Sequence, residues 1–96
     1  MTKIHISDVN SGNNLFESRM LELRDSVKYT TEYLLNHLIL TPDFVSPNAI
    51  TFKLQDGNHA FSEYIRRFPD LDIVDIPVAC FRCSERLLDK YEDKCL

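Results

Sequence analysis

The longest periodic stretch of the sequence, residues 13–40, limits the fold most strongly. Apolar residues recur there at alternating spacings of four and three, with Thr30 at the one missing step. This spacing keeps one face of a helix against a core or a partner. The apolar positions are Phe16, Met20, Leu23, Val27 and Leu34. The pattern predicts one long helix over about residues 14–39, ended by Thr41-Pro42 because a residue before proline avoids helical angles.

The expected long helix has a start signal and surplus apolar surface. Asn14 is the expected N-cap, and Glu17 follows three residues later, as in a capping box. Leu21, Tyr29 and Tyr33 lie off the main stripe. Either several elements of the same chain cover this surface, or the surplus pairs two copies in a homodimer through the long helix.

Length and composition are those of one soluble domain covering residues 1–96. The hydrophobic fraction of 44% and the charged fraction of 27% suit a modest core that needs neither disulfides nor metal. No stretch approaches the roughly 20 apolar residues of a membrane span, and the first residues lack the apolar segment of a secretory signal. Three cysteines, an odd number, argue against a disulfide framework. We therefore expect a cytoplasmic protein with no membrane partner.

Outside the long helix, three short strands are expected. Apolar and polar residues alternate over residues 3–7 and 49–55, and a run rich in β-branched residues covers 71–76. Alternation with period two is typical of a strand with one buried face. Residues 41–48, which contain two prolines, are expected to form a loop.

Two further helices complete the prediction. Over residues 58–68 apolar residues recur at i, i+3, i+4 and i+7, which favours a helix capped by Asn58. A hairpin strand over residues 59–65 is the alternative. The last helix is expected over residues 80–93, with Cys80, Cys83, Leu87 and Tyr91 on one face.

These elements give the order β-α-β-α-β-α. The expected fold is a small single α+β domain in which about three short strands form a sheet and three helices pack on it. The long helix provides a right-handed crossover between the first two strands, and the strand order stays open.

Cys80-Phe81-Arg82-Cys83 is the most distinctive short motif, and zinc binding is one interpretation of it. Two thiolates separated by two residues can hold one ion, with Cys95 as a third ligand. His59, His37 or His5 would supply the fourth ligand. A second interpretation is that Cys80 and Cys83 are small buried residues on a helix face, and this is the one we favour.

A third interpretation of the motif is redox chemistry. A strand, Pro77, the Cys80–Cys83 pair and a helix follow one another, and this order resembles thioredoxin-like proteins. In that family the helix N-terminus lowers the pKa of the first thiol. The strands and cis-proline that follow the motif in that family are absent here, so we do not expect redox activity.

Enzymatic and nucleic-acid functions are disfavoured. The chain contains only two glycines, and it has no phosphate-binding loop and no nucleophile turn, so we expect a protein that is not an enzyme and has no cofactor.

A net charge of −4 opposes broad attraction to nucleic acid. Arg66 and Arg67, with Tyr64 and Phe68 beside them, suggest a small single-strand platform. Glu63 and Asp70 flank that pair and oppose phosphate, so direct nucleic-acid binding stays an alternative only.

The sequence therefore favours an acidic interaction module. Such a protein binds and blocks or regulates a larger partner, either a protein or a protein–nucleic-acid complex. In size and charge it resembles small inhibitors of phages and mobile elements, including anti-defence proteins, by composition alone. Aromatic and arginine anchors with acidic steering residues usually make such interfaces. The expected contact residues are Tyr29, Tyr33, Tyr64, Arg66, Asp72, Asp75, Glu85, Asp89 and Tyr91.

Overall fold

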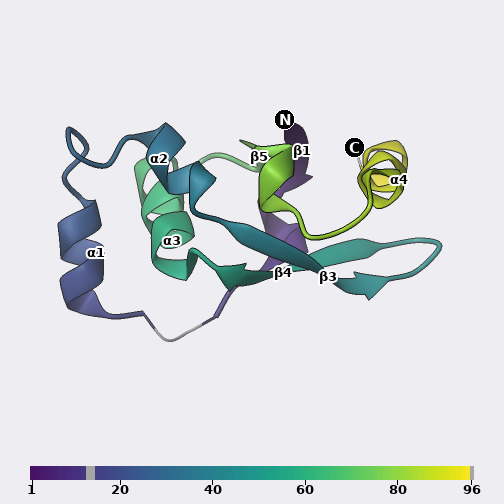
Figure 1. Cartoon of the computed structure of the whole chain (residues 1–96), viewed down its shortest axis with the longest axis horizontal. Helices are drawn as coiled ribbons and strands as arrows, with labels where there is room; N and C mark the ends of the chain where they lie inside the picture. Colours follow the sequence, from purple (N-terminus) through teal and green to yellow (C-terminus); the bar gives the residue numbers. More distant parts are fainter. Residues whose placement is uncertain (13–14, 96) are drawn as a thin grey trace.

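The computed structural model describes residues 1–12 and 15–95, and only the backbone of Cys95 (Figure 1). Within these residues the chain forms four α-helices, five strands and two 3-10 helices. The helices are α1 (Glu17–Leu23), α2 (Thr31–Asn36), α3 (Asn58–Arg67) and α4 (Glu85–Cys95). The strands are β1 (Thr2–His5), β2 (Val9–Asn10), β3 (Ile39–Val45), β4 (Ile50–Asp56) and β5 (Ile73–Ile76), and the 3-10 helices are η1 (Ile6–Asp8) and η2 (Val78–Cys80). The α+β class is confirmed, whereas the predicted element count and alternating order are wrong.

The strands form two sheets. The larger has the order β2-β4-β3, with β4 antiparallel to β3 and parallel to β2, and the smaller pairs β1 with β5 antiparallel. In β4 the buried residues Ile50, Phe52 and Leu54 alternate with more exposed ones, as their period of two predicts. Strands are thus present in the three predicted places, with shifted ends.

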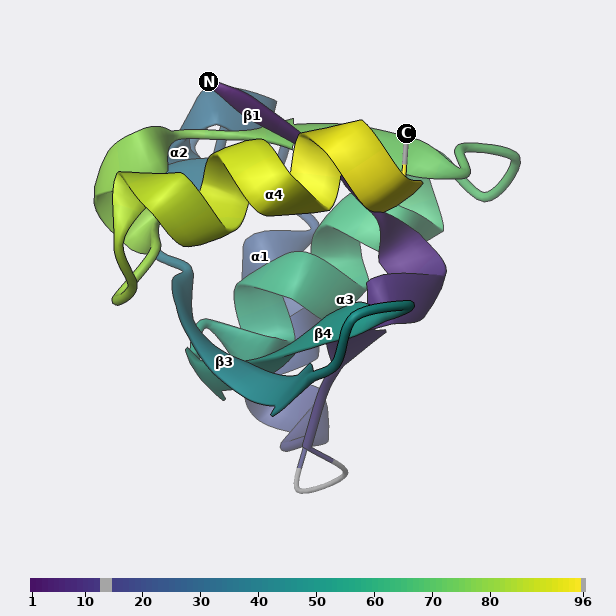
Figure 2. The same cartoon turned by 90° about the vertical axis from the view of Figure 1, so that its right-hand side faces the viewer.

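The molecule is elongated, measuring 40 × 24 × 23 Å. In Figure 1, α1, α2 and α3 gather at one end and α4 lies at the other, beside the β3–β4 hairpin. Figure 2 shows α4 running across the molecule above that hairpin. The core is continuous between the two ends, because buried residues of all five strands and all four helices belong to one cluster.

The predicted long helix is wrong, because two polar side chains end and restart it. After α1, the Asp25 carboxylate accepts hydrogen bonds from the backbone N–H groups of Val27 and Lys28, at 3.2 and 3.3 Å. Thr30 is the N-cap of α2, and its hydroxyl accepts the N–H of Tyr33 at 3.2 Å. The predicted cap Asn14 lies outside the described residues. The missing apolar step at Thr30 was therefore a cap signal.

The predicted loop at residues 41–48 is also wrong, because most of it belongs to β3. Pro42 lacks an N–H group and is tolerated because β3 lies at an edge of its sheet. The register with β4 shifts between Pro42 and Phe44. This irregularity makes the exposed edge less suited to pairing with another strand.

The helix predicted at residues 58–68 is confirmed, and the hairpin alternative is wrong. Gly57, rather than Asn58, is its N-cap, with a φ of 86° that favours glycine. A Cβ atom at Gly57 would lie 2.6 Å from the backbone oxygen of His37. The last helix begins at Glu85 instead of Cys80, and the Ser84 hydroxyl accepts the N–H of Leu87 near its start.

A buried carboxylate joins the helices at one end of the molecule. The Glu63 side chain is fully buried, yet it accepts hydrogen bonds from Arg66 and Arg67 at 2.8–2.9 Å. Arg67 also donates to the backbone oxygen of Leu23, at the end of α1, at 2.9 Å. Burial raises the pKa of Glu63, but the hydrogen bonds and charges of the two arginines outweigh burial and lower it. Glu63 therefore stays charged and fixes α1 to α3 through Arg67.

Replacing Glu63 by Gln should destabilise the protein. Removing one partner of a buried ion pair leaves the other charge unsatisfied, and we expect a loss of about 3 kcal/mol in the free energy of unfolding. Because the pKa of Glu63 is lowered on folding, its contribution is complete above the ordinary glutamate pKa. That contribution is lost as the pH falls through the lowered value.

Urea unfolding between about pH 7 and pH 3 measures both effects. The difference between wild type and Glu63→Gln should shrink at the acid end. The control is Arg66→Gln, whose partly exposed guanidinium should matter less. Equal losses for the two variants would contradict this account of Glu63.

Candidate interaction surface

The three tyrosines that were predicted as anchors outside α3 are not free surface residues. Tyr91 is fully buried and packs edge-on against Phe52. Its hydroxyl donates to Asp8 at 2.6 Å and accepts the backbone N–H of His5 at 3.0 Å. Tyr91 therefore joins α4 to the strands, and its burial disfavours the predicted contact with a partner.

Tyr29 and Tyr33 are also engaged within the chain. Tyr29 is 6% exposed, and its hydroxyl donates to Glu22 at 2.6 Å. Tyr33 is half-buried, with its ring centroid 4.0 Å from that of His37. The centroids of these two rings lie 5.1 Å apart. The predicted homodimer used a long helix that the described residues do not form, so it loses that structural basis.

Arg66 is the predicted arginine anchor, and its charge is already compensated. Its guanidinium forms a two-point contact with Glu63, and the side chain is 47% exposed. Arg67 is held by the same carboxylate. Glu63 thus offsets one of the two positive charges of the basic pair that suggested a nucleic-acid platform, which weakens that alternative.

Three of the predicted contact residues, Tyr64, Asp72 and Asp75, lie around the end of α3 and the start of β5, where there is also an apolar patch. Tyr64 and Phe68 lie with ring centroids 5.0 Å apart, and Leu71 links two shallow hollows, one containing Phe68 and the other Asp72. Burial, and then the negative charge of Asp75, raise the pKa of Tyr64. Lys3 lies opposite Asp75 in the β1–β5 register, so part of the patch's negative charge is offset.

A second surface gathers Glu85 and Asp89, and we call it the Met1 groove. One hollow of about 390 Å³ lies between α2 and the end of β5, and another of about 220 Å³ lies along α4. Met1 lines both hollows. Their lining residues are Met1, Thr2, Thr31, Glu32, Leu35, Asn36, Pro77, Val78, Glu85, Leu88, Asp89 and Glu92.

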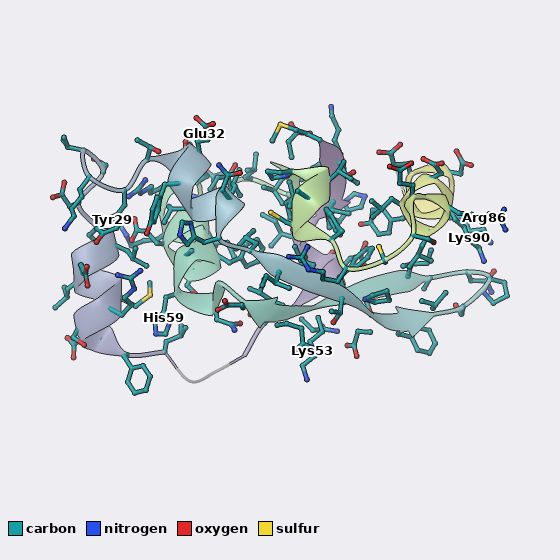
Figure 3. The ribbon with its side chains drawn as sticks, viewed as in Figure 1. Tyr29, Glu32, Lys53, His59, Arg86 and Lys90 are labelled. Carbon is teal, nitrogen blue, oxygen red and sulfur yellow. The ribbon has the colours of Figure 1, made fainter. Side chains whose placement is uncertain are left out.

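The Met1 groove has two unlike parts: the hollow between α2 and β5 has a mainly apolar lining, and the smaller hollow along α4 has a mainly polar one. Met1 is 73% exposed and Val78 41% exposed. The rim carries four exposed carboxylates: Glu32, Glu85, Asp89 and Glu92. In the part of the chain that the structure describes, none of the four forms an ion pair. In Figure 3, Glu32 points outward from α2, whereas Arg86 and Lys90 point away from the body on the far side of α4.

The spacing on α4 places three like charges of the rim beside one another. Asp89 is four residues after Glu85 and three before Glu92, so these like charges are neighbours on one helix face. Such pairs usually destabilise a helix slightly. The sequence signal was present as an i, i+4, i+7 acidic series, but Glu32 could join it only through the fold.

The structure favours buried thiols over a zinc site. Cys80 is buried, and its thiol donates to the backbone oxygen of Leu35 at 3.3 Å. Burial raises the pKa of both Cys80 and Cys83, which disfavours the thiolate that zinc or redox chemistry needs. Neither residue lies in α4, so the predicted shared helix face is wrong. No group of three or more metal-ligating side chains occurs among the side chains described, and the side chain of Cys95 lies outside them.

His59, the favoured fourth zinc ligand, lies elsewhere and is engaged. Its Nε2 accepts the backbone N–H of Phe16 at 2.8 Å. It lines a polar hollow of about 280 Å³ together with Arg19, Tyr33, His37 and Asp56. Arg19 pairs with Glu22 at 3.1 Å, and the two imidazoles contact backbone groups. These bonds hold the helices together. Among the residues described here, they do not place a nucleophile next to a general base.

Comparison with known proteins provides no assignment, because no protein-family model, curated protein or solved structure matches this chain. Among the described residues, no helix has the length and apolar character needed to cross a membrane. The functional argument therefore depends on the surfaces themselves.

The thiol interpretation predicts that metal chelation leaves folding unchanged. Incubation with EDTA should not shift the melting temperature, because the Cys80 thiol is satisfied by a carbonyl oxygen. In peptide mapping after brief alkylation of the native protein, Cys80 should stay unmodified while half-buried Cys83 reacts slowly. A melting temperature that falls with EDTA and returns with zinc would overturn this interpretation.

Proposed function

We propose that this protein is a small, acidic, non-enzymatic interaction module that binds a basic surface of a larger macromolecular partner through the Met1 groove. The observation that carries the proposal is a set of four exposed carboxylates that line the two hollows and form no ion pair among the described residues. Such a protein can block or regulate its partner by occupying the partner's surface. Its size and acidity suit the inhibitors made by phages and mobile elements, which is the origin we propose.

The two parts of the groove would contribute differently to binding. The exposed apolar side chains of Met1 and Val78 offer area whose burial stabilises a complex. The carboxylates at the rim would raise the association rate and select a partner rich in lysine and arginine. They would also gain counter-charges that the chain itself does not provide in the described residues.

The patch around Tyr64 is the second candidate for the same function. It has two adjacent aromatic rings and three exposed apolar residues, Phe68, Leu71 and Ile73, and aromatic anchors often dominate interfaces. We favour the Met1 groove because its four exposed carboxylates form no ion pair among the described residues, whereas Lys3 lies opposite Asp75 in the patch.

Charge reversal tests the proposal directly. The variant Glu85→Lys/Asp89→Lys should lose partners that the wild-type protein retains from a cell extract, with affinity reduced roughly tenfold. The matched control is Glu17→Lys/Asp43→Lys, which changes the net charge equally at exposed sites on α1 and β3. Circular dichroism should confirm that both variants are folded.

Quantitative mass spectrometry of the retained proteins distinguishes the surfaces. Retention that is lost only in the groove variant supports the proposal. Retention that survives in the groove variant but is lost in Asp72→Lys/Asp75→Lys assigns binding to the Tyr64 patch and overturns the assignment to the Met1 groove. Equal loss in the groove variant and the control would mean that only net charge matters.

A further inference from the structure

One hydrogen bond at the start of α1 depends on the protonation state of His59. His59 is the second residue of α3, and Figure 3 shows it between α1 and α3. Its Nε2 lies 2.8 Å from the backbone nitrogen of Phe16, the N-cap residue of α1. A backbone N–H group only donates, so Nε2 must present its lone pair and the ring proton must be on Nδ1. The two rings also stack, with centroids 5.8 Å apart and planes 11° from parallel.

His37 lies in the same polar hollow but forms the opposite kind of bond. Its Nδ1 is 2.8 Å from the backbone oxygen of Tyr33. A carbonyl oxygen only accepts, so this nitrogen carries a proton whether the imidazole is neutral or charged. Proton uptake therefore leaves the His37 bond intact, whereas proton uptake at Nε2 of His59 removes the acceptor for Phe16.

The other charged and titratable groups around His59 come from each neighbouring element. Arg19 of α1, Tyr33 and His37 of α2, and Asp56 at the end of β4 line the hollow. Arg19 is partly offset by Glu22, and Asp56 accepts the backbone N–H of Gly57. The lining of the hollow thus includes one cation, Arg19, and one carboxylate, Asp56.

The far end of α1 is held by contacts that do not titrate in the histidine range. Arg67 donates to the backbone oxygen of Leu23 and to Glu63, and Leu23 is buried. The two arginines lower the pKa of Glu63, so this cluster remains charged where histidines ordinarily take up protons. The N-terminal end of α1 thus depends on a proton-sensitive bond, and its C-terminal end does not.

We propose that His59 is a pH-sensitive latch for α1: protonation of Nε2 breaks the bond to Phe16, and α1 pivots about its fixed end at Leu23. This device goes beyond the interaction function and involves a different part of the molecule. Release would separate the Phe16 ring from His59 and open the polar hollow between α1 and α3. Neither the Met1 groove nor the β4 core would be disturbed.

Nuclear magnetic resonance on the full chain tests the latch. As the pH falls from about 8 to about 5, the Phe16 amide resonance should titrate with the same midpoint as the His59 ring. The hydrogen-exchange protection of this amide, corrected for intrinsic rates, should fall about fivefold or more, the effect of losing one net hydrogen bond. The Leu23 amide should keep its protection.

Two substitutions separate the latch from general acid effects. His59→Gln supplies an oxygen acceptor that does not titrate, so the pH response of Phe16 should disappear. His37→Gln is the matched control and should leave that response unchanged. A Phe16 amide that stays protected after the wild-type His59 ring has become charged would overturn the proposal, as would a response that persists in His59→Gln. The wild-type titration decides the question even if a variant does not fold.

Discussion

Glu63 is the constraint on which the helical end of the molecule depends. Helices as short as α1 and α2 are unstable in isolation, and α1 contributes only Leu23 to the core. The carboxylate of Glu63 positions Arg67, and Arg67 satisfies a carbonyl at the end of α1 that would otherwise lack a partner in the helix. The buried charge of Glu63, although costly to bury, thus fixes α1 to α3.

Tyr91 has the corresponding role at the other end, where it joins α4 to β1 and η1 by hydrogen bonds from a buried ring. With α2 held on α3 and α4 held on the strands, Met1 stays exposed beside the buried Thr2 and Ile4 of β1. The Met1 groove is the result. Its acidic rim combines Glu32 of α2 with three carboxylates of α4, so the surface exists only when both ends of the molecule are folded.

Local patterns in the sequence predicted the parts of the fold that local interactions determine. The alternation around Phe52 and the helical period from Phe61 to Phe68 were sufficient for β4 and α3. The long helix failed because Asp25 and Thr30, short polar residues in an apolar series, bind backbone N–H groups and interrupt it. Val27, on the predicted buried stripe, is 91% exposed. The apolar periodicity alone could not reveal the break in the helix, because the break comes from hydrogen bonds between the side chains of Asp25 and Thr30 and backbone N–H groups.

Only part of the candidate interaction surface could be predicted from the sequence, because contacts between distant segments decide which side chains are exposed. Glu85 and Asp89 were recognisable from the acidic series, and the fold places both on the groove rim. Tyr91 seemed an anchor because it is aromatic and lies in an acidic helix, but its contacts with Asp8 and Phe52 come from distant segments. Glu32 and His59 gained their roles from tertiary neighbours that no spacing in the sequence indicates.

The central claim is that the groove carboxylates form no ion pair with the described residues of the chain and are kept for a partner. Urea unfolding of Asp89→Asn/Glu92→Gln against wild type, at low and high salt, tests it most directly without a known partner. The account predicts that neutralisation raises the free energy of unfolding by about 0.5 kcal/mol. It also predicts that the gain shrinks when salt screens the repulsion. A loss of stability at low salt would show that these carboxylates pair with cations of the same chain, such as Arg86 or Lys90, and would contradict the claim.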